Sequence, residues 1–542
     1  MDTTDDLFRR LEKLNAIGAA LSSERNIDRL LENILLAAKA ITHADGGTLY
    51  RVSEDRKSLR FEIVRTDSLN IAYGGTTGEP ISVKFPNLPL YREDGEPNNS
   101  MIAAYSAIHA ESVNIGDAYT EKGFDFSGTR KFDQMTGYRS QSFLSVPMKN
   151  HENEIIGVLQ LINAIDPESG AVRVFSNADQ RLAESLASQA AIALTNRQLI
   201  SQLEELFESF IHLINLAIDE KSPYTGGHCQ RVPSLTMMLA EAADATSEGP
   251  LSSFSMTDKD RYELKIAGLL HDCGKVTTPV HVVDKATKLQ TIFDRIQMID
   301  TRFEVLKRDA EIAMLRNVLA GEDRVSAERS LQDQIRGMDE DRDFLRRANV
   351  GGEAMKPEDQ ERVRCVSRKY RWRNTEGREV EFLTAEEVEN LSIRAGTLTQ
   401  SERETINYHI VATIKMLESL PWPNHLKRVP EYAGGHHERM DGKGYPKGLK
   451  REEMSLPARI MGIADIFEAL TARDRPYKHG MKLSEALRIL GNFSNNGHID
   501  PDLFEVFVKQ KVYLKYAEQY LDAAQIDTLD DDKAAGTGGA PA

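Results

Sequence analysis

Cysteine is scarce in this chain of 542 residues, with only Cys229, Cys273 and Cys365. Three scattered cysteines are too few for a disulfide framework, which favours a reducing cytoplasm. Basic residues are not in excess either: the net charge of −16 argues against a general nucleic-acid-binding protein. The acidic start MDTTDDLFRR has no apolar core of a secretory signal, and no apolar run is long enough to cross a membrane. We therefore expect a cytoplasmic protein with neither a nucleic-acid partner nor a membrane partner.

The sequence is rich in metal-capable side chains at a few well-separated places. The densest group is HHERMDGKGYP, residues 436–446, in which two adjacent histidines precede a Gly-Tyr-Pro turn. Further candidates lie far from it in the chain: His228, the pair His271-Asp272 in HDCGK, His409, and Asp465 in ADIFEALTARDRPYK. A single histidine of this kind is more often an ordinary core or surface residue. Seven ligand-type residues in this order instead predict a metal site.

Imidazole and carboxylate ligands without thiolate suit phosphoester chemistry. Two metal ions bridged by a carboxylate can activate water, neutralise developing charge and position the ester. Asp272 is the natural bridge, because it directly follows His271 at the end of the apolar segment IAGLLHD. The ligand types fit Fe, Mn, Co, Ni or Zn. We expect two divalent transition metals per chain and favour Fe or Mn.

The ordered motifs H…HD…H…HH…GYP…D resemble the HD-GYP family of metal-dependent phosphohydrolases, over roughly residues 205–520 with one large interruption. The resemblance implies a metal set in which His228, His271, Asp272 and Asp465 hold one ion. His409, His436 and His437 would hold the other, with Asp272 shared. Some members place a glutamate four residues before the first histidine and bind a third metal. Tyr224 occupies that position here, so two metals are predicted.

Cationic and aromatic residues near these motifs are candidates for substrate binding. Lys275 in HDCGK resembles the family lysine that contacts the scissile phosphate, so Asp272 and Lys275 are the predicted catalytic residues. Arg475 and Lys478 in DRPYK resemble residues that grip the phosphates of a cyclic dinucleotide. Tyr445 is expected to shape the guanine side of the pocket or to order its loop. For the basic residues, the alternative is an ordinary solvated surface.

The first 178 residues have a different pattern. Helical stripes up to about residue 42 precede strand-like segments, of which QSFLSVPMKN and EIIGVLQLINAI read as a hairpin across the turn HENE. This pattern predicts an α+β domain, an antiparallel sheet with flanking helices, and it resembles a GAF sensor domain. Residues 114–148 resemble the pocket-lining segment of cyclic-nucleotide-binding GAF domains. The resemblance implies a small-molecule ligand, with a cyclic nucleotide as the candidate, near Asp117, Phe132, Asp133 and Asn163; the alternative is a GAF wall without a nucleotide.

The rest of the chain is predicted to have three parts: a linker helix, a helical domain and a tail. Residues 179–219 are a linker helix, in which Leu199, Leu203, Leu206, Phe210, Leu213 and Ala217 have coiled-coil spacing. This spacing predicts a homodimer, although the stripe could instead pack on the catalytic domain. Residues 220–525 form the all-α HD-GYP domain, interrupted by a charged helical insertion at about 285–396 that reads as a helical hairpin or coiled-coil arm. Residues 526–542 read as a disordered tail.

The resemblance to the HD-GYP family implies a cyclic di-GMP phosphodiesterase that forms linear pGpG, with GMP as the alternative final product, under control of the GAF domain. One alternative is an HD phosphohydrolase acting on another cyclic dinucleotide. A second is a non-catalytic receptor that binds cyclic di-GMP and signals through partners. The complete ligand set argues against the receptor, whereas the long insertion keeps it open as a docking surface or lid.

Overall fold

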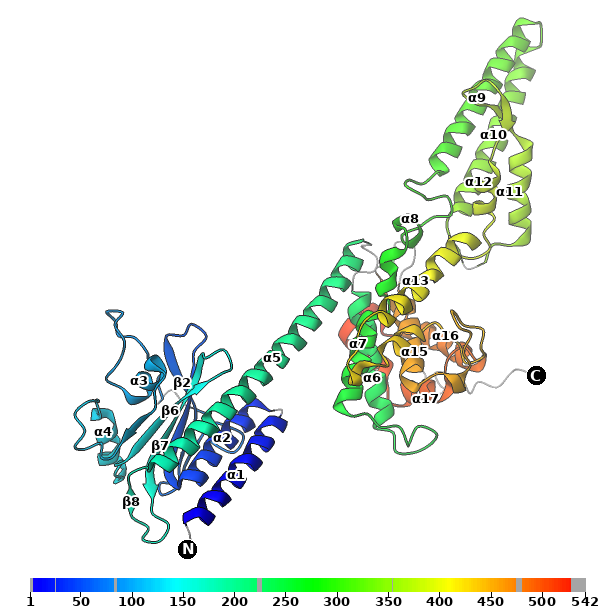
Figure 1. Ribbon diagram of the computed structural model, residues 1–542. Helices are drawn as coiled ribbons and strands as arrows, with labels where there is room; N and C mark the ends of the chain where they lie inside the picture. Colours follow the sequence, from blue (N-terminus) through cyan, green and yellow to red (C-terminus); the bar gives the residue numbers. More distant parts are fainter. Residues whose placement is uncertain are drawn as a thin grey trace. The chain divides into compact units, whose positions relative to one another are not determined.

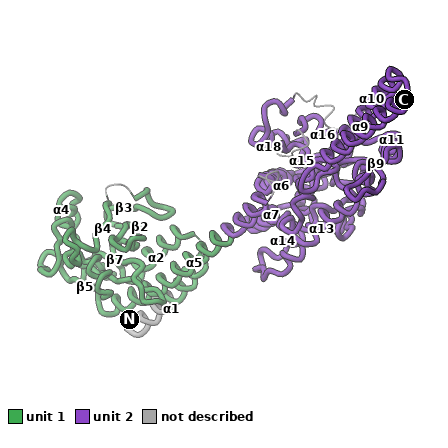
Figure 2. Tube along the Cα trace, turned by 90° about the horizontal axis from the view of Figure 1, so that it is seen from above, with its two compact units in different colours: residues 1–207 green, residues 208–542 purple. Residues whose placement is uncertain are grey.

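The computed structural model describes residues 3–24, 26–81, 85–221, 227–352, 354–473 and 480–527. The chain divides into two compact units, Met1–Phe207 and Glu208–Ala542, which Figure 2 shows in different colours. The predicted tail lies almost wholly outside the described residues, as do Tyr224, Arg475 and Lys478. Within the described residues, no helix is long and apolar enough to cross a membrane.

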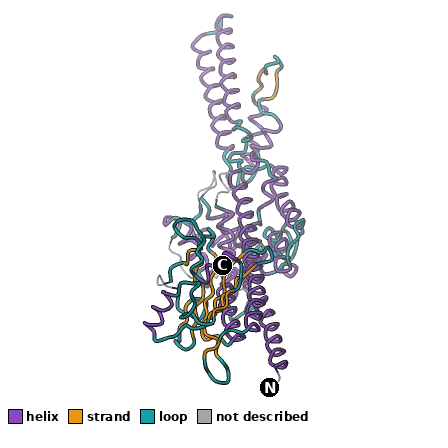
Figure 3. The backbone as a smooth tube through the Cα atoms, turned by 60° about the vertical axis from the view of Figure 1, so that its left-hand side comes forward, coloured by secondary structure: helices purple, strands orange, loops and turns teal. Residues whose placement is uncertain are grey.

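The first unit is built on one antiparallel sheet. Its strands follow the order β3-β2-β1-β7-β6-β5, and two short strands, β4 and β8, pair at its margins. Figure 3 shows these strands in orange. Their bounds are β1 Ala44–Val52, β2 Ser58–Thr66, β3 Ile71–Tyr73, β4 Leu88–Pro89, β5 Val113–Ile115, β6 Phe143–Lys149, β7 Ile155–Ile165 and β8 Val172–Arg173. The predicted hairpin is β6–β7, and the predicted α+β fold with an antiparallel sheet is confirmed.

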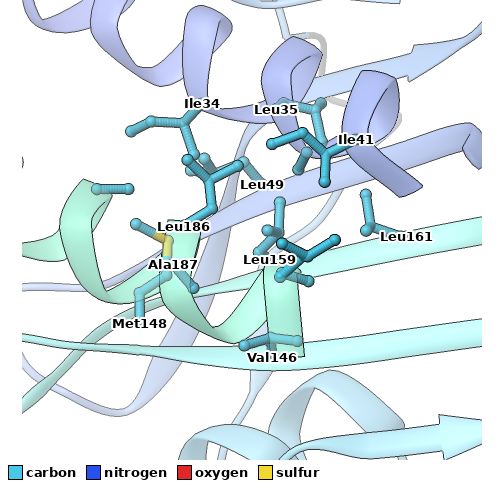
Figure 4. Close-up of a cluster of buried hydrophobic side chains, with 14 of the residues drawn as sticks. Ile34, Leu35, Ile41, Leu49, Val146, Met148, Leu159, Leu161, Leu186 and Ala187 are labelled. Carbon is cyan, nitrogen blue, oxygen red and sulfur yellow. The ribbon is translucent and has the colours of Figure 1, made fainter. Parts of the chain in front are cut away.

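Side chains of alternating direction give this sheet two apolar faces. Leu49 and Leu159 join α1 (Thr3–Ser23), α2 (Ile27–Thr42) and the first part of α5 in one core, drawn in Figure 4. Their chain neighbours Tyr50 and Val158 face the opposite side, where they pack with α3 (Ile102–His109). A further helix, α4 (Ser127–Thr136), follows β5.

Helix α5 runs without interruption from Asn177 to Lys221, as the lack of Pro and Gly in this stretch predicts. Its coiled-coil stripe is apolar and exposed: Leu203 is 64% exposed, Phe210 56% and Leu213 59%. Burying such residues would be favourable, so this stripe is a candidate contact surface.

The second unit is mostly helical. Its core elements are α6 His228–Asp244, α7 Asp258–Leu270, η1 Cys273–Thr277, α8 Val280–Val283, α13 Gln400–Glu418, η2 Asn424–Leu426, α14 Val429–Gly434, η3 Arg451–Glu453, α15 Leu456–Thr471, α16 Leu483–Asn495, α17 Pro501–Lys509, α18 Val512–Tyr520 and η4 Ala523–Gln525. Polar N-caps begin several of these helices: Thr257 and Thr399 each form a capping box, at the starts of α7 and α13. The predicted helical character of this region is confirmed.

The insertion, residues 285–396, is a folded substructure of its own. Helices α9 (Ile296–Leu319) and α10 (Arg324–Asn349) form a long hairpin, visible in Figure 1, followed by α11 (Pro357–Lys369) and α12 (Ala385–Leu391). The sequence prediction of a purely helical arm missed one feature, the two-stranded hairpin β9 (Arg371–Arg373) and β10 (Glu379–Glu381). The insertion also has a separate apolar core, which includes Phe303, Leu345 and Phe382.

Candidate metal centre

Six elements of the second unit bring the predicted ligands together. His228 is the first residue of α6, and Asp465 lies on α15. His271 and Asp272 lie between α7 and η1, directly after the apolar end of α7, as the segment IAGLLHD predicts. A second set lies on α13 (His409) and just after α14 (His436 and His437). All five histidines and both aspartates are buried or largely buried.

The ligand atoms form two neighbouring groups. His228, His271 and Asp272 offer atoms within 4.8 Å of one another, and so do His409, His436 and His437. Asp465 adds to the first group, since its Oδ1 lies 3.5 Å from Nε2 of His228 and 4.0 Å from Nε2 of His271. The structure therefore brings together the seven residues that the sequence singled out as ligands.

Asp272 faces both groups with different oxygens. Its Oδ2 lies 2.9 Å from Nε2 of His228 and 3.2 Å from Nε2 of His271. Its Oδ1 lies 3.2 Å from Nε2 of His409, in the second group. A carboxylate with one oxygen directed to each group has the arrangement of a bridging ligand between two cations.

Backbone carbonyls orient the histidine rings. In His271, His409 and His436, Nδ1 donates to the carbonyl oxygen three residues earlier, at distances of 2.7, 2.5 and 2.6 Å. This hydrogen bond places the proton on Nδ1 and leaves the lone pair of Nε2 directed into the centre. Nε2 of His436 is buried without a hydrogen-bond partner, and so is Oδ1 of Asp272. Buried acceptors without donors are costly, and a cation between them would satisfy both.

The charge state of these residues also fits cation binding. Burial lowers the pKa of His436 well below its usual value and that of His437 to about 4, so both rings are neutral at pH 7. Burial alone would raise the pKa of Asp272, but the cation of Lys275 and contacts with His271 and His228 hold it well below its usual value. Neutral imidazoles around ionised carboxylates are the protonation states that transition metals require.

Two residues that the sequence prediction missed support His228. The carboxylate of Glu468 lies 2.7 Å from Nδ1 of His228 and pairs with Arg231, also at 2.7 Å. Burial alone would lower the pKa of His228, but Glu468 and Asp272 outweigh it and raise that pKa to about 9. The two carboxylates beside His228 therefore favour a positive charge at its Nε2, supplied by a proton or a metal ion. The signal in the sequence is the spacing in ADIFEAL, which places Glu468 one helical turn after Asp465.

The Gly-Tyr-Pro loop is fixed against the second histidine group. The ring of Tyr445 stacks on that of His437, with centroids 4.8 Å apart, and its backbone N–H donates to the carbonyl of His437. Buried Glu438, to which the sequence analysis assigned no role, accepts from the backbone N–H groups of Lys447 and Leu449. A Cβ at Gly444 would lie 2.4 Å from the backbone of Glu438, so this close approach requires glycine. Tyr445 thus orders the loop, one of its two predicted roles.

The other predicted substrate contacts are only partly described. Lys275 lies within the centre, where its Nζ is 2.5 Å from Oδ2 of Asp272. Arg475 and Lys478 lie outside the described residues.

In the first unit, the predicted ligand residues of the sensor domain mostly serve the fold. Asp133 is buried and accepts from the hydroxyls of Tyr119 and Ser140 and from the Ser140 N–H. Asn163 bonds the backbone of residues 139, 141 and 142. Asp117 accepts from the N–H of Tyr119, and Phe132 is 38% exposed.

Comparisons with known proteins agree with this architecture. A family model described as GAF domain matches residues 26–194, and two models described as HD domain match residues 225–360 and 382–503. The chain thus belongs to the class of proteins that join a GAF domain to an HD domain. Its HHE…GYP motif follows the His271-Asp272 pair as in the HD-GYP family, and the predicted resemblance is confirmed.

Three curated relatives show local similarity. A 3′3′-cGAMP-specific phosphodiesterase 1 of Vibrio cholerae is 47% identical over 15% of this chain and 19% of its own length. A cyclic di-GMP phosphodiesterase of Pseudomonas aeruginosa is 50% identical over 21% of this chain and 27% of its own. A 3′3′-cGAMP-specific phosphodiesterase 3 of V. cholerae is 38% identical over 21% and 24%, respectively. The matched stretches thus span no more than 27% of these relatives.

Proposed function

We propose that the chain is a metal-dependent cyclic di-GMP phosphodiesterase that forms linear pGpG, with further hydrolysis to GMP as an open alternative. The observation that carries this proposal is Asp272, whose two oxygens face two separate histidine groups. The name of the P. aeruginosa relative supports the choice of substrate. The first group with Asp465 would hold one divalent transition metal and the second group the other, with Fe or Mn favoured.

When bound, two such ions neutralise phosphate charge and make water a competent nucleophile at neutral pH. The residues of the chain prepare the site for this chemistry. His271, His409 and His436 present unprotonated Nε2 atoms, and Asp272 stays ionised between the two groups. Lys275 brings a cation to the same place, where it would contact a nonbridging oxygen of the scissile phosphate. Cleavage of the P–O3′ bond opens the ring, and the 3′-oxygen leaves as a hydroxyl.

Product analysis tests the proposal. Purified protein is loaded anaerobically with Fe(II) or Mn(II) and incubated with cyclic di-GMP, and the products are separated by chromatography. We expect pGpG or GMP from the wild type and from Asp258→Ala, whose aspartate is exposed on α7. Asp272→Ala should lose activity by at least about 10²–10³-fold, because both groups lose their shared ligand. Binding of cyclic di-GMP without any product would instead support the receptor function.

A second substrate has specific support, because two of the relatives are named 3′3′-cGAMP-specific phosphodiesterases. The same assay with 3′,3′-cGAMP decides between the two substrates. A kcat/KM for cyclic di-GMP that exceeds the value for 3′,3′-cGAMP keeps our assignment, and the reverse order replaces it.

We further propose that the protein is a homodimer in the cytoplasm, regulated by a small molecule, with a cyclic nucleotide as the candidate, bound to its GAF domain. The exposed stripe of α5 supports the dimer, because coiled-coil spacing on an exposed helix favours pairing with a second copy. Light scattering should give a dimer for the wild type and a monomer for the variant Leu203→Glu/Phe210→Glu. A monomeric wild type at micromolar concentration would contradict this part of the proposal.

A further inference from the structure

The two ends of the insertion come together at Lys285 and Thr397, where the insertion joins the core of the second unit. We call this junction the root. The hydroxyl of Thr397, just after the insertion, donates to the carbonyl of Lys285 at its beginning, at 2.8 Å. Thr399 then caps α13, the helix that carries His409. Thr399, which closely follows the root, therefore lies ten residues before a candidate metal ligand in the chain.

A buried ion pair joins this root to α13. Lys285 is 2% exposed, and its Nζ lies 2.8 and 2.7 Å from the two carboxylate oxygens of Glu402. The same Nζ donates to Oδ1 of Asn390 in the insertion helix α12, at 2.8 Å. Glu402 also completes the capping box of α13 by accepting from the N–H of Thr399. A lysine is rarely buried this completely. Here its ammonium group pairs with Glu402 on α13 and donates to Asn390 in the insertion.

One face of α13 continues from this ion pair into the metal centre. Glu402, Ile406, His409 and Thr413 follow one another at spacings of four, three and four residues, which places them on one helical stripe. Ile406 supplies the carbonyl that orients the ring of His409. Thr413 accepts from the N–H of Gly274, in the loop of Asp272. A rotation or shift of the first turn of α13 would therefore move His409 relative to Asp272.

The root also has space for such a movement. A cavity of about 350 Å³ lies beside the ion pair, lined by Lys285 and Ile406 among others, together with Gly351 and Gly396 of the insertion. The close packing of protein interiors resists movement, and a cavity of this size relaxes that constraint. Together with the Thr399 cap, the ion pair thus holds the start of α13 where packing alone leaves room.

We propose that Lys285 is a positioning residue for the second metal group: through Glu402 it fixes α13 and thereby places His409. The insertion is then a structural part of the metal centre rather than an appendage. This inference rests on the proposed metal-dependent function, but it concerns metal binding and can be tested without a substrate.

The test compares two buried lysines of the same root. Lys285→Met removes the cation that joins Glu402. Lys288→Met is the matched control: Lys288 is equally buried, but among the described residues its Nζ has its partners within the insertion, namely the carbonyls of Leu391 and Ile393 and the sulfur of Met355. Each purified full-length variant is titrated with Mn(II), and free and bound metal are measured. Circular dichroism and the Tm report whether each variant is folded.

We expect two bound equivalents in the wild type and in Lys288→Met. In Lys285→Met, one of the two should bind about tenfold more weakly or worse, as when a group that orients a ligand is removed. Hydrogen exchange of the metal-free protein should also become faster in the first turns of α13. Equal metal affinities in the two lysine variants, or a fall of both sites together, would overturn the inference.

A second variant covers the case in which Lys285→Met does not fold. The double variant Lys285→Met/Glu402→Gln leaves no unpaired buried charge, and its glutamine retains an oxygen for the Thr399 N–H. It should show the same selective weakening of one site, and wild-type affinity at both sites would overturn the inference. Two normal metal sites in the wild type without hydrolysis of cyclic di-GMP would refute the proposed function while leaving this comparison valid.

Discussion

The two units each bury a cluster of polar side chains, but the clusters differ in how their hydrogen bonds are satisfied. In the first unit, Glu32 accepts from Arg65, Thr76 and Thr77, so a donor meets each carboxylate oxygen. In the second unit, acceptors converge, and Nε2 of His436 and Oδ1 of Asp272 lack donors. A satisfied cluster stabilises a fold, whereas an unsatisfied one calls for a ligand. Burial alone does not distinguish the two clusters, because Glu32 and Asp272 are equally buried.

Substitution of Gly274 should have the largest effect on the geometry of the second cluster. A Cβ at this position would lie 2.0 Å from the carbonyl oxygen of His409 and 2.6 Å from the N–H nitrogen of Thr413. Gly274→Ala therefore has to push the loop of Asp272 away from α13, and we expect a loss of roughly 3 kcal/mol in stability. Thermal unfolding measures it, with Gly352→Ala as control, because nothing lies within 4 Å of a Cβ there. A Gly274→Ala protein as stable as the control would show that the loop and α13 are not rigidly packed.

Glu468→Gln should have a smaller effect, confined to metal binding. The amide cannot supply the negative charge that Glu468 gives to His228 and Arg231, so metal affinity should fall by about 10–100-fold. Metal titration measures the change, with the exposed Glu505→Gln as control. Unchanged affinity would remove Glu468 from the account of the site.

Glu32→Gln should affect stability alone. Arg65 and hydroxyl donors hold the pKa of Glu32 at about 2 against the opposite effect of burial. Because this value lies below that of the unfolded chain, its stabilisation is complete above about pH 4.5 and is lost as the pH falls toward 2. We expect the variant to be less stable by about 1–2 kcal/mol at pH 7 and to show a weaker dependence on pH between 4.5 and 2. Metal binding should not change; a change would break the comparison between the clusters.

The residues of the candidate metal centre were easier to single out in the sequence than the residues around them. Metal-capable residues such as His228, the pair His271-Asp272 and Asp465 can be recognised by type and order, because their chemistry depends on side-chain identity. Glu468 and Glu438 act through contacts that form only when distant helices and loops meet, so their roles could not be derived from spacing alone. The same limit applies to Lys285, whose partner Glu402 lies 117 residues away.

The fold was predictable where periodicity was strong. The strand-like segments of β6 and β7 across the turn HENE and the uninterrupted helix α5 were clear in the sequence. The hairpin β9–β10 was missed because its strands have three residues each and lie within a strongly charged segment. Short strands of this kind depend on tertiary contacts, such as the packing of Arg302 over the ring of Trp372.

We propose above all that hydrolysis of cyclic di-GMP needs two metal ions, with Asp272 as the ligand that both share. The most direct test adds Mn(II) stepwise to metal-free protein under anaerobic conditions and measures pGpG formation at each step. The account predicts little turnover at one equivalent per chain and a steep rise as the second is bound. Full turnover at one equivalent, or none at two with substrate bound, would contradict it.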